Sequence, residues 1–384
     1  MNRILYLLIL TLFTASLLTG CQASPFLAQK MEKTQPDTLA PYRLVVLQSY
    51  MDSLDIPAPA SVDSLFSTLY RLRYGRQPRH LSYLALTGRT DSTLIHNEIA
   101  NFLNPENTDF LAGIRALEPR AAPYQALKKH YYRLRREEKT DSLTAVYEAL
   151  NTFRWMQRFT DSTCILINIA AAELVVLEEE GNVALRMRTI VGSRSHQTPA
   201  FASHITEIIT YPYWNVPRSI AINEILPKVK RDAGYLSRNN MQVIGANGRV
   251  VDPAQLNWSS FSRANFPYRF RQSTGCDNAL GLVKFNLDNP YSIYLHDTNA
   301  RSLFSRTNRW LSHGCIRLQK PTELANLLLN EAVFDEEYLN QCRLGARPGS
   351  IRLPGPVPVF ILYLPADVDQ TGALRWHRNV YGWP

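Results

Sequence analysis

The spacing of apolar residues divides the chain into two regions. From Ala40 to about Phe159, apolar positions recur at intervals of three and four residues, which places them on one face of a helix. The clearest runs are Val62-Leu65-Phe66-Leu69-Tyr70 and Leu127-Tyr131-Leu134. Residues 42–159 are therefore predicted to form an all-α scaffold domain.

Beyond this region the apolar residues occur in short continuous runs separated by turn residues. Such runs begin at Cys164, Leu174 and Val183, and Gly181-Asn182 before the last of them is a good hairpin turn. Further runs cover 205–210, 282–287 and 291–296. Many short strands joined by hairpins favour a mainly antiparallel β sandwich or partial barrel over residues 160–384. With the helices before it, the predicted fold class is α+β.

An insertion of different composition interrupts the strand region. Residues 216–278 contain one helical pattern, Ile220-Ile225-Val229, followed by loop signals at Gly234 and Asn239-Asn240. Because the segment lies between strands in chain order, it is predicted to be a lid that keeps water from a site. A purely structural excursion is the alternative.

The first residues have the pattern of an export signal. Arg3 is followed by an apolar segment, too short to span a bilayer comfortably, that ends in Leu18-Thr19-Gly20-Cys21. This ending resembles the lipobox of bacterial lipoproteins. The resemblance implies removal of residues 1–20 as a signal peptide and lipidation of Cys21, which anchors the protein to a membrane through a polar tether, residues 21–41. An ordinary secretory peptide is the alternative.

Charge narrows the possible functions. The chain has 384 residues and a formal net charge of +9, but its basic residues are spread out and form no patch interleaved with aromatic residues. Nucleic-acid binding is therefore not expected. The surplus is typical of a solvated basic surface, and attraction to an acidic cell-wall polymer is the alternative.

The sequence assigns no chemistry to three of the five cysteines, which are Cys164, Cys276 and Cys342. Cys164 opens an apolar strand and is predicted to be a small buried residue. Cys276 and Cys342 are able to pair in an oxidising compartment, and the sequence leaves open whether they do.

The most informative segment is Ser312-His313-Gly314-Cys315-Ile316-Arg317-Leu318. A thiol becomes a good nucleophile when a neighbouring group lowers its pKa or takes its proton, and a glycine beside it lets a substrate carbonyl approach the backbone. His296 ends the predicted strand 291–296 and lies 315 − 296 = 19 residues before Cys315, enough chain for a loop to pair the two side chains. The pattern predicts a nucleophilic cysteine with a histidine base.

His296 and the Ser-His-Gly-Cys-Ile-Arg run resemble the signature of the L,D-transpeptidases, cysteine enzymes that crosslink peptidoglycan. The resemblance to the larger, lid-bearing type of this family extends from roughly Leu150 to Asn330. The further blocks that carry it are Gln197-Thr198-Pro199, Tyr211-Pro212-Tyr213-Trp214-Asn215-Val216-Pro217, Asn265-Phe266-Pro267-Tyr268-Arg269 and Asn278-Ala279-Leu280-Gly281.

The resemblance implies an acyl transfer in two steps. Cys315 attacks a donor tetrapeptide, usually one with meso-diaminopimelate as its third residue, and releases the terminal D-alanine. A second stem peptide then resolves the thioester with its side-chain amine, which gives a 3→3 crosslink. His296 takes the thiol proton or holds a thiolate as an ion pair, and a backbone carbonyl, not the Asp297 side chain, fixes its tautomer. This chemistry requires no cofactor.

Five further residues receive supporting roles. The alternative is simple packing for Tyr294, His313 and Trp214, and a structural salt bridge for Arg317. The backbone N–H groups beside the nucleophile, with Gly314 among them, and the Tyr294 hydroxyl are candidates to stabilise the oxyanion. Relatives use the position of His313 to support the site. Arg317 is expected to grip a carboxylate of the donor stem peptide through two hydrogen bonds, and Trp214 to line the lid side of the site.

Other interpretations of the same residues remain open. A zinc site of His296, His313 and Cys315 lacks a fourth ligand and the usual ligand spacing, so no metal is predicted. The same thioester would also serve a protein amine, a D-amino acid or water as acceptor. A noncatalytic peptidoglycan-binding scaffold is a further alternative. The expected location is the periplasmic cell envelope, with Gln22 favouring the outer membrane as the site of the lipid anchor.

Overall fold

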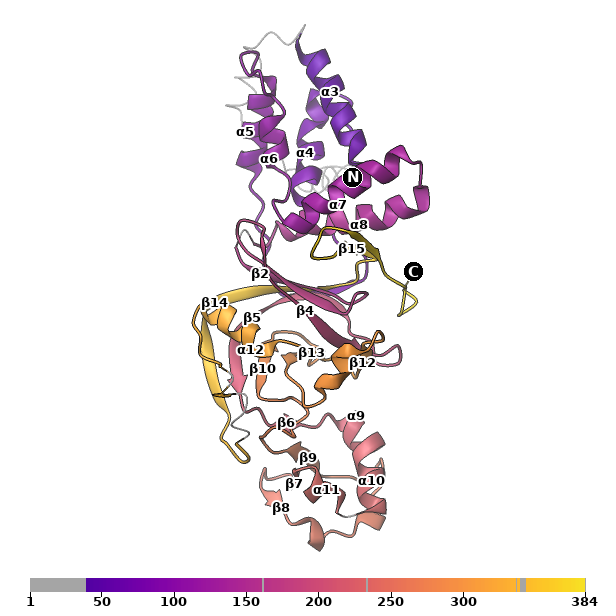
Figure 1. Cartoon of the computed structure of the whole chain (residues 1–384), viewed down its shortest axis with the longest axis vertical. Helices are drawn as coiled ribbons and strands as arrows, with labels where there is room; N and C mark the ends of the chain where they lie inside the picture. The colour runs from indigo at the N-terminus through magenta and orange to yellow at the C-terminus, as the bar shows by residue number, and fades with distance from the viewer. Residues whose placement is uncertain (1–38, 161, 233, 336, 339–342, 384) are drawn as a thin grey trace, which may run out of the picture.

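The computed structural model describes residues 39–160, 162–232, 234–335, 337–338 and 343–383 (Figure 1). The predicted signal peptide, Cys21 and the predicted tether up to residue 38 lie outside the described residues, as does Cys342. Figure 1 shows an elongated molecule with the first helices at one end, the large sheet in the middle and the 216–278 segment at the other end. Within the described residues, no helix is both long and apolar enough to cross a membrane.

Helices dominate the first region. They are α3 (Leu39–Ser53), the 3-10 turn η1 (Val62–Ser64), α4 (Leu65–Tyr74), α5 (Ser92–Leu103), α6 (Ala112–Ala116), α7 (Ala122–Arg136) and α8 (Thr140–Met156). The apolar faces of α3 to α6 meet in one core that includes Leu69, Leu72 and Phe102, all without exposed surface. This burial of one face is what the spacing of three and four residues predicted.

The helical region nevertheless contains a strand. β1 (Leu81–Leu84) pairs in parallel with β5 (Ala200–Thr210), at the end of the large sheet. The prediction of an all-α region was wrong here, because four residues are too few to display a period and the partner strand lies 200 − 81 = 119 residues away. A hydrogen bond of 2.8 Å from the N–H of Ala122 to the carbonyl of Gly181 also joins the helices to the sheet.

The second region is built on a ten-stranded mixed sheet, so the α+β class with helices first and strands second is confirmed. The strands other than β1 and β5 are β2 (Cys164–Asn168), β3 (Glu173–Leu177), β4 (Val183–Gly192), β10 (Val283–Leu287), β11 (Leu295–His296), β12 (Trp310–Ser312), β13 (Ile316–Leu318) and β14 (Gly349–Leu362). Their order is β1-β5-β10-β11-β13-β4-β3-β2-β14, with β12 beside β4. Because β14 also pairs with β5, eight of these strands form a closed ring.

Both faces of the sheet are covered around β2. Ile165 and Ile167 belong to a core shared with α12 (Pro321–Leu329), whereas Cys164 and Leu166 belong to a core shared with α7 and α8. A strand that is buried on both faces is apolar at every position, which explains the continuous runs in the sequence. The hairpin of β15 (Ala366–Val368) and β16 (Leu374–Trp376) packs on the helical side.

The 216–278 segment forms a compact unit with a core of its own, which includes Ile225, Val229 and Phe270. Its four-stranded sheet has the order β6 (Trp214–Asn215), β9 (Arg269–Gln272), β7 (Met241–Ile244), β8 (Val250–Val251). The helical pieces are α9 (Arg218–Ile220), the π-helical turn η2 (Ala221–Ile225), α10 (Leu226–Arg231), α11 (Tyr235–Arg238) and the 3-10 turns η3 (Pro253–Gln255) and η4 (Trp258–Ser260). The sequence pattern predicted the first helix and the loops but not these strands.

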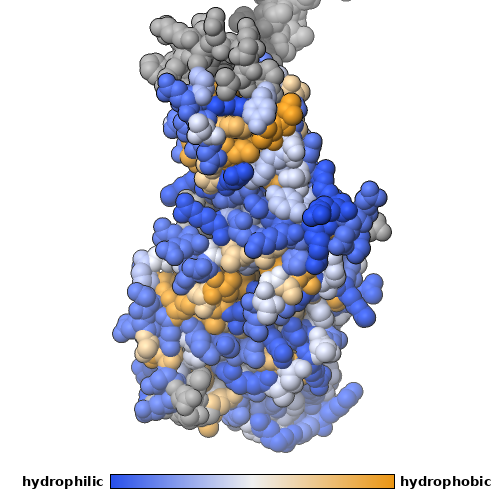
Figure 2. Space-filling view, turned by 45° about the horizontal axis from the view of Figure 1, so that its top comes forward, coloured by the Kyte–Doolittle hydropathy of each residue, from blue (hydrophilic) through white to orange (hydrophobic). Residues whose placement is uncertain are grey.

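The surface seen in Figure 2 is mostly hydrophilic, and its apolar residues lie in separate areas. Among the described residues, the large apolar side chains with the most exposure are scattered along the chain, from Tyr42 in α3 to Trp376 in β16. Isolated exposed apolar residues of this kind are normal for a folded protein and need no partner.

Candidate active site

Cys315 lies in the turn between β12 and β13 and is half-buried. Gly314 before it has a φ of +114°, and a Cβ there would come within 3.1 Å of Ile293 Cδ1. The Ser312 hydroxyl donates to the carbonyl of Cys315 at 2.6 Å and accepts from the N–H of Gly314 at 3.1 Å. The N–H of Gly314 is therefore already used. The N–H of Cys315 has no acceptor among the described residues, which leaves it as the backbone donor for an oxyanion.

A second layer of hydrogen bonds supports this turn. The hydroxyl of Thr198 donates to the carbonyl of Gly314 at 2.7 Å and accepts from the N–H of Gly192 at 2.8 Å. Tyr381, near the C-terminus, accepts from the N–H of Thr198 at 3.1 Å and donates to the carbonyl of Gly192 at 2.7 Å. These side chains are buried, so the position of the turn depends on them.

His296 reaches the site from the neighbouring strand. β11 contains only Leu295 and His296, shorter than the predicted strand 291–296, because the chain turns at Ser292 with a φ of +57°. His296 is 4% exposed, and its Nδ1 lies 2.5 Å from the backbone carbonyl of Asp297. A carbonyl only accepts, so Nδ1 carries the proton and Nε2 keeps the lone pair of a base.

The Asp297 side chain points elsewhere, as the sequence predicted. Its carboxylate accepts from the N–H of Leu282 at 3.0 Å and pairs with Arg301 at 2.7 Å. The backbone carbonyl, and not this carboxylate, therefore orients the histidine.

Three polar residues form a row across neighbouring strands. Lys284 in β10 is the register partner of His296 in β11, and His296 is the register partner of Arg317 in β13. Sequence analysis missed Lys284, although a lysine within the apolar run 282–287 was a signal for it. The ammonium of Lys284 lies 4.3 Å from the centre of the Tyr294 ring, which is 5.6 Å from the His296 ring.

The electrostatics of the site favour a neutral resting pair. Burial, with the positive charges of Arg317 and Lys284, lowers the pKa of His296 to about 3. Burial also raises the pKa of the Cys315 thiol, although hydrogen bonding with Tyr294 and the two cations act in the opposite direction. At neutral pH the residues are thus a thiol and an uncharged imidazole, which favours proton transfer during attack over a preformed ion pair.

The thiol does not yet contact its base. The thiol donates a weak hydrogen bond of 3.8 Å to the carbonyl of Ser292, and no hydrogen bond joins it to His296 in the described part of the chain. Catalytic hydrogen bonds often tighten only when substrate is bound. Rotation of the thiol toward Nε2 is therefore required before attack.

Arg317 is half-buried, and no carboxylate among the described residues forms an ion pair with it. Its Nε is buried and has no hydrogen-bond partner among the described residues, and burial lowers the pKa of its guanidinium. Burial likewise lowers the pKa of Lys284. Two poorly solvated cations beside the nucleophile make this side of the site attractive to an anionic group.

The 216–278 segment contacts the nucleophile turn. Glu224, in the π-helical turn η2, pairs with His313 at 2.7 Å, and the His313 ring lies 4.7 Å from that of His196. The His313 side chain is 40% exposed and points toward η2 of the 216–278 segment. The Trp214 side chain, half-buried against the core of the segment, interacts with the Tyr294 hydroxyl. Glu224 had no distinguishing signal in the sequence.

The other cysteines have different surroundings. Cys164 is buried and free, as predicted, and burial raises the pKa of its thiol to about 12. Cys276 is disulfide-bonded, but the pairing with Cys342 falls outside the described residues. No group of three or more potential metal ligands occurs in the described ranges.

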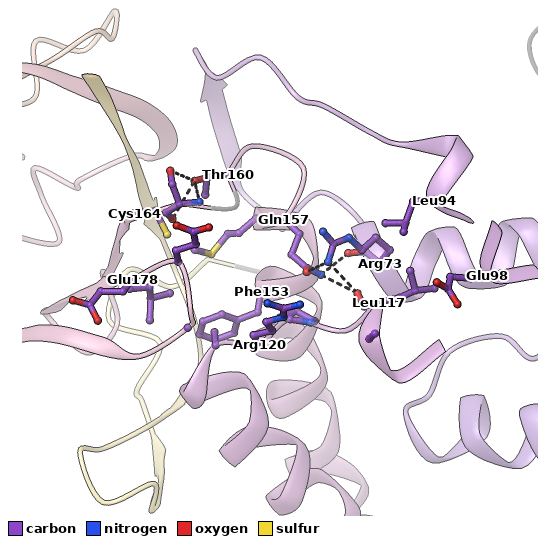
Figure 3. A pocket seen from close by; sticks show the side chains of 18 of the residues that line it. Arg73, Leu94, Glu98, Leu117, Arg120, Phe153, Gln157, Thr160, Cys164 and Glu178 are labelled. Atoms are coloured by element: carbon purple, nitrogen blue, oxygen red, sulfur yellow. Dashed lines mark hydrogen bonds between the residues drawn. The ribbon is translucent and has the colours of Figure 1, made fainter. Parts of the chain in front are cut away.

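A cavity lies between the helical region and the β3–β4 hairpin (Figure 3). It encloses about 450 Å³. Arg73 and Gln157 point toward one another on its wall, and the Gln157 amide donates to the carbonyl of Arg73 at 2.7 Å. The wall holds neither the nucleophile nor the base, so this cavity belongs to the joint between the two regions.

Comparisons with known proteins agree with the chemistry that the site geometry indicates. The profile of the YkuD family, the L,D-transpeptidase catalytic domain, matches residues 162–359. A protein of Haemophilus influenzae named "Putative L,D-transpeptidase" is 37% identical over 219 residues, 57% of this chain and 44% of that protein. The chain thus matches less than half the length of that relative.

Solved structures with partial likeness include an L,D-transpeptidase from Mycobacterium smegmatis, with 14% identity, a TM-score of 0.24 and coverage of 52% of this chain and 58% of that chain. The catalytic domain of an E. faecium L,D-transpeptidase acylated by ertapenem has 11% identity, a TM-score of 0.23 and coverage of 53% and 98%. TM-scores this low add nothing to the assignment.

Proposed function

Because this chain belongs to the YkuD family of L,D-transpeptidase catalytic domains, we propose that it forms 3→3 crosslinks between peptidoglycan stem peptides through a thioester on Cys315. The observation that carries the proposal is the row of Lys284, His296 and Arg317 across three strands, with Cys315 two residues before Arg317. It combines a nucleophile, an uncharged base and two cations able to hold a carboxylate of the donor.

In the first step, His296 Nε2 takes the thiol proton as Sγ attacks the carbonyl carbon of the donor peptide. The oxygen becomes an oxyanion that accepts hydrogen bonds from the N–H of Cys315 and the hydroxyl of Tyr294. The intermediate collapses when its C–N bond breaks. The leaving amine of D-alanine receives the proton from the imidazolium, and a thioester remains.

In the second step, the side-chain amine of an acceptor stem attacks the thioester. His296 takes a proton from this amine, the C–S bond breaks and the sulfur recovers its proton. Arg317 is assigned the role of binding the carboxylate of the donor peptide. His313 and Trp214 are assigned to the lid side of the site, where the acceptor has to enter.

The same proposal includes the division of the chain. Residues 42–159 are the scaffold, residues 160–384 are the catalytic domain, built as a mainly antiparallel partial barrel, and residues 216–278 are its lid. A peptidoglycan-modifying family works in the cell envelope. We include in the proposal that residues 1–20 are removed and that Cys21 is lipidated. The lipid would attach the protein to the membrane, with the outer membrane favoured, and residues 21–41 would form a tether.

The test is incubation of the purified protein with disaccharide-tetrapeptides, followed by mass spectrometry, with Cys315→Ala as control. A Cys315-dependent dimer with a 3→3 link and release of D-alanine is expected. Release of D-alanine without the dimer would mean that the thioester forms but that the acceptor is not a second stem peptide. No acylation of Cys315 and no turnover would contradict the proposal.

A further inference from the structure

A small pocket in the helical region is lined by three arginines. It encloses about 130 Å³ between the end of α3, the end of α4 and α8. Arg71 and Arg76 lie on its exposed side, and Arg154 on its buried side. Asp55 is the carboxylate that lines it. The lining therefore carries three positive charges against one negative charge.

Arg154 is the unusual member of this group. It is 1% exposed, and its Nη2 has no hydrogen-bond partner among the described residues. Its Nε donates to the hydroxyl of Tyr124 at 3.2 Å, a neutral acceptor. A buried cation usually has an ionic partner, since an uncompensated buried charge is costly.

The carboxylate of Glu118, which shares the Tyr124 hydroxyl with Arg154, already has other partners. Glu118 is 3% exposed and accepts from the hydroxyls of Tyr50 and Tyr124 and from Lys128, whose ammonium lies at 2.8 Å. Its charge is balanced by Lys128, and the Tyr124 hydroxyl that donates to it also accepts from Arg154. Within the described residues, no ion pair joins Arg71, Arg76 or Arg154 to a carboxylate, Asp55 included.

The wall of the pocket is held rigidly. The side chain of Asn151 accepts from the N–H of Arg76 and donates to its carbonyl, both at 2.8 Å. Gly75 has a φ of +50°, and a Cβ there would lie 2.7 Å from the carbonyl oxygen of Asn151. Arg158 donates to the carbonyls of Tyr74 and Gly75 at 2.7 and 2.8 Å. The turn that presents Arg76 is thus placed before any ligand binds, which lowers the entropy cost of binding.

We propose that this pocket binds a phosphate-sized oxyanion, either free phosphate or the phosphate of a larger headgroup whose remainder lies outside. The volume admits such a group but not a peptide or a sugar ring with its substituents. Guanidinium groups match the geometry of phosphate oxygens through paired hydrogen bonds. The site lies in the helical region, away from Cys315, and does not depend on the proposed reaction.

The test measures binding of inorganic phosphate to the full chain by calorimetry, at constant ionic strength set with chloride. Removal of the buried Arg154 endangers folding. The test therefore uses a double variant of the exposed arginines, Arg71→Gln with Arg76→Gln. Arg79→Gln with Arg89→Gln is the matched control, since these exposed arginines are close in sequence but do not line the pocket.

We expect saturable phosphate binding that weakens at least about tenfold in the first double variant and is unchanged in the control, with equal unfolding midpoints for both. Glycerol 3-phosphate distinguishes the sources: tighter binding than inorganic phosphate identifies a headgroup, and weaker binding identifies free phosphate. Absence of binding above chloride, or equal binding in both double variants, would overturn the proposal.

Discussion

The hydroxyl of Thr198 donates a hydrogen bond of 2.7 Å to the carbonyl of Gly314, the residue before the nucleophile. Thr198 has no exposed surface, and the same hydroxyl accepts from the N–H of Gly192. One side chain thus links the nucleophile turn to the end of β4. The angle at which Cys315 is presented to a substrate depends on it.

Replacement of Thr198 by valine is expected to slow acylation of Cys315 about tenfold, because a buried carbonyl and a buried N–H lose their partner, at a cost of about 1–3 kcal/mol. Thr198→Ser should retain most of the rate. The measurement is the rate of acylation by donor peptide, followed by mass spectrometry. Ser203→Ala is the control, since its hydroxyl is also buried but bonds the carbonyl of Asp288. Equal slowing in the control would mean that general destabilisation is the cause.

The pH dependence of alkylation tests the resting state of the nucleophile. Because burial raises the pKa of Cys315 above its ordinary value of 9.0, the rate of reaction with iodoacetamide should still be rising at pH 9. Lys284→Met removes a charge that lowers the pKa of this thiol and should move the profile to higher pH. A plateau that begins near pH 7 would instead reveal a preformed thiolate.

His296 is expected to make the fold sensitive to acid. Its pKa falls from 6.5 to about 3 on folding, so between these values the unfolded state binds more protons than the folded state. The resulting stability is fully present above pH 6.5 and is lost as the pH falls toward 3. Urea unfolding at pH 7 and pH 4 should show a smaller loss for His296→Gln than for the unmodified protein. An identical loss in both would be inconsistent with a buried neutral imidazole.

Arg317→Lys should lower kcat/KM for the donor at least about tenfold, because an ammonium does not reproduce the paired hydrogen bonds of a guanidinium. A donor whose carboxylates are amidated should lose much less on the same substitution. Arg306→Lys, at an exposed position, is the matched control. The role in carboxylate binding would be refuted by an equal loss with both donors.

The pair between Glu224 and His313 should make a small contribution to holding the 216–278 segment against the nucleophile turn. Both side chains are about 40% exposed, so the pair is worth at most about 1 kcal/mol. Glu224→Gln is expected to raise amide hydrogen exchange in residues 218–231 by no more than about fivefold. Glu331→Gln, at an exposed position after α12, should change nothing there. Unchanged exchange in Glu224→Gln would show that the pair does not hold the segment.

Local pattern was enough to predict much of the fold. The helical faces, the strand runs and the position of the inserted segment all follow from periodicity within about a dozen residues. β1 was missed because its formation depends on β5, far away in the sequence. The strands of the 216–278 segment were missed for a similar reason: they are short and their pairing supplies the stability.

The residues of the candidate site likewise divide into those that local sequence indicates and those whose position depends on the fold. Cys315 and His296 carry chemical signals in their own segments, so the sequence alone was enough to propose them as nucleophile and base. Lys284 lies in the site because of the register of β10 with β11, and local sequence does not specify this register. Glu224 is presented by a π-helical turn, a local irregularity that helical spacing does not reveal.

The hydrogen bonds of Tyr381 also bear on the order in which the chain is made. Tyr381 lies 381 − 315 = 66 residues after Cys315, yet it bonds both Thr198 and Gly192 beneath the nucleophile turn. During synthesis the thiol emerges well before this support. A growing chain therefore carries a cysteine whose surroundings are unfinished, and Tyr381 has to emerge before the nucleophile is correctly held.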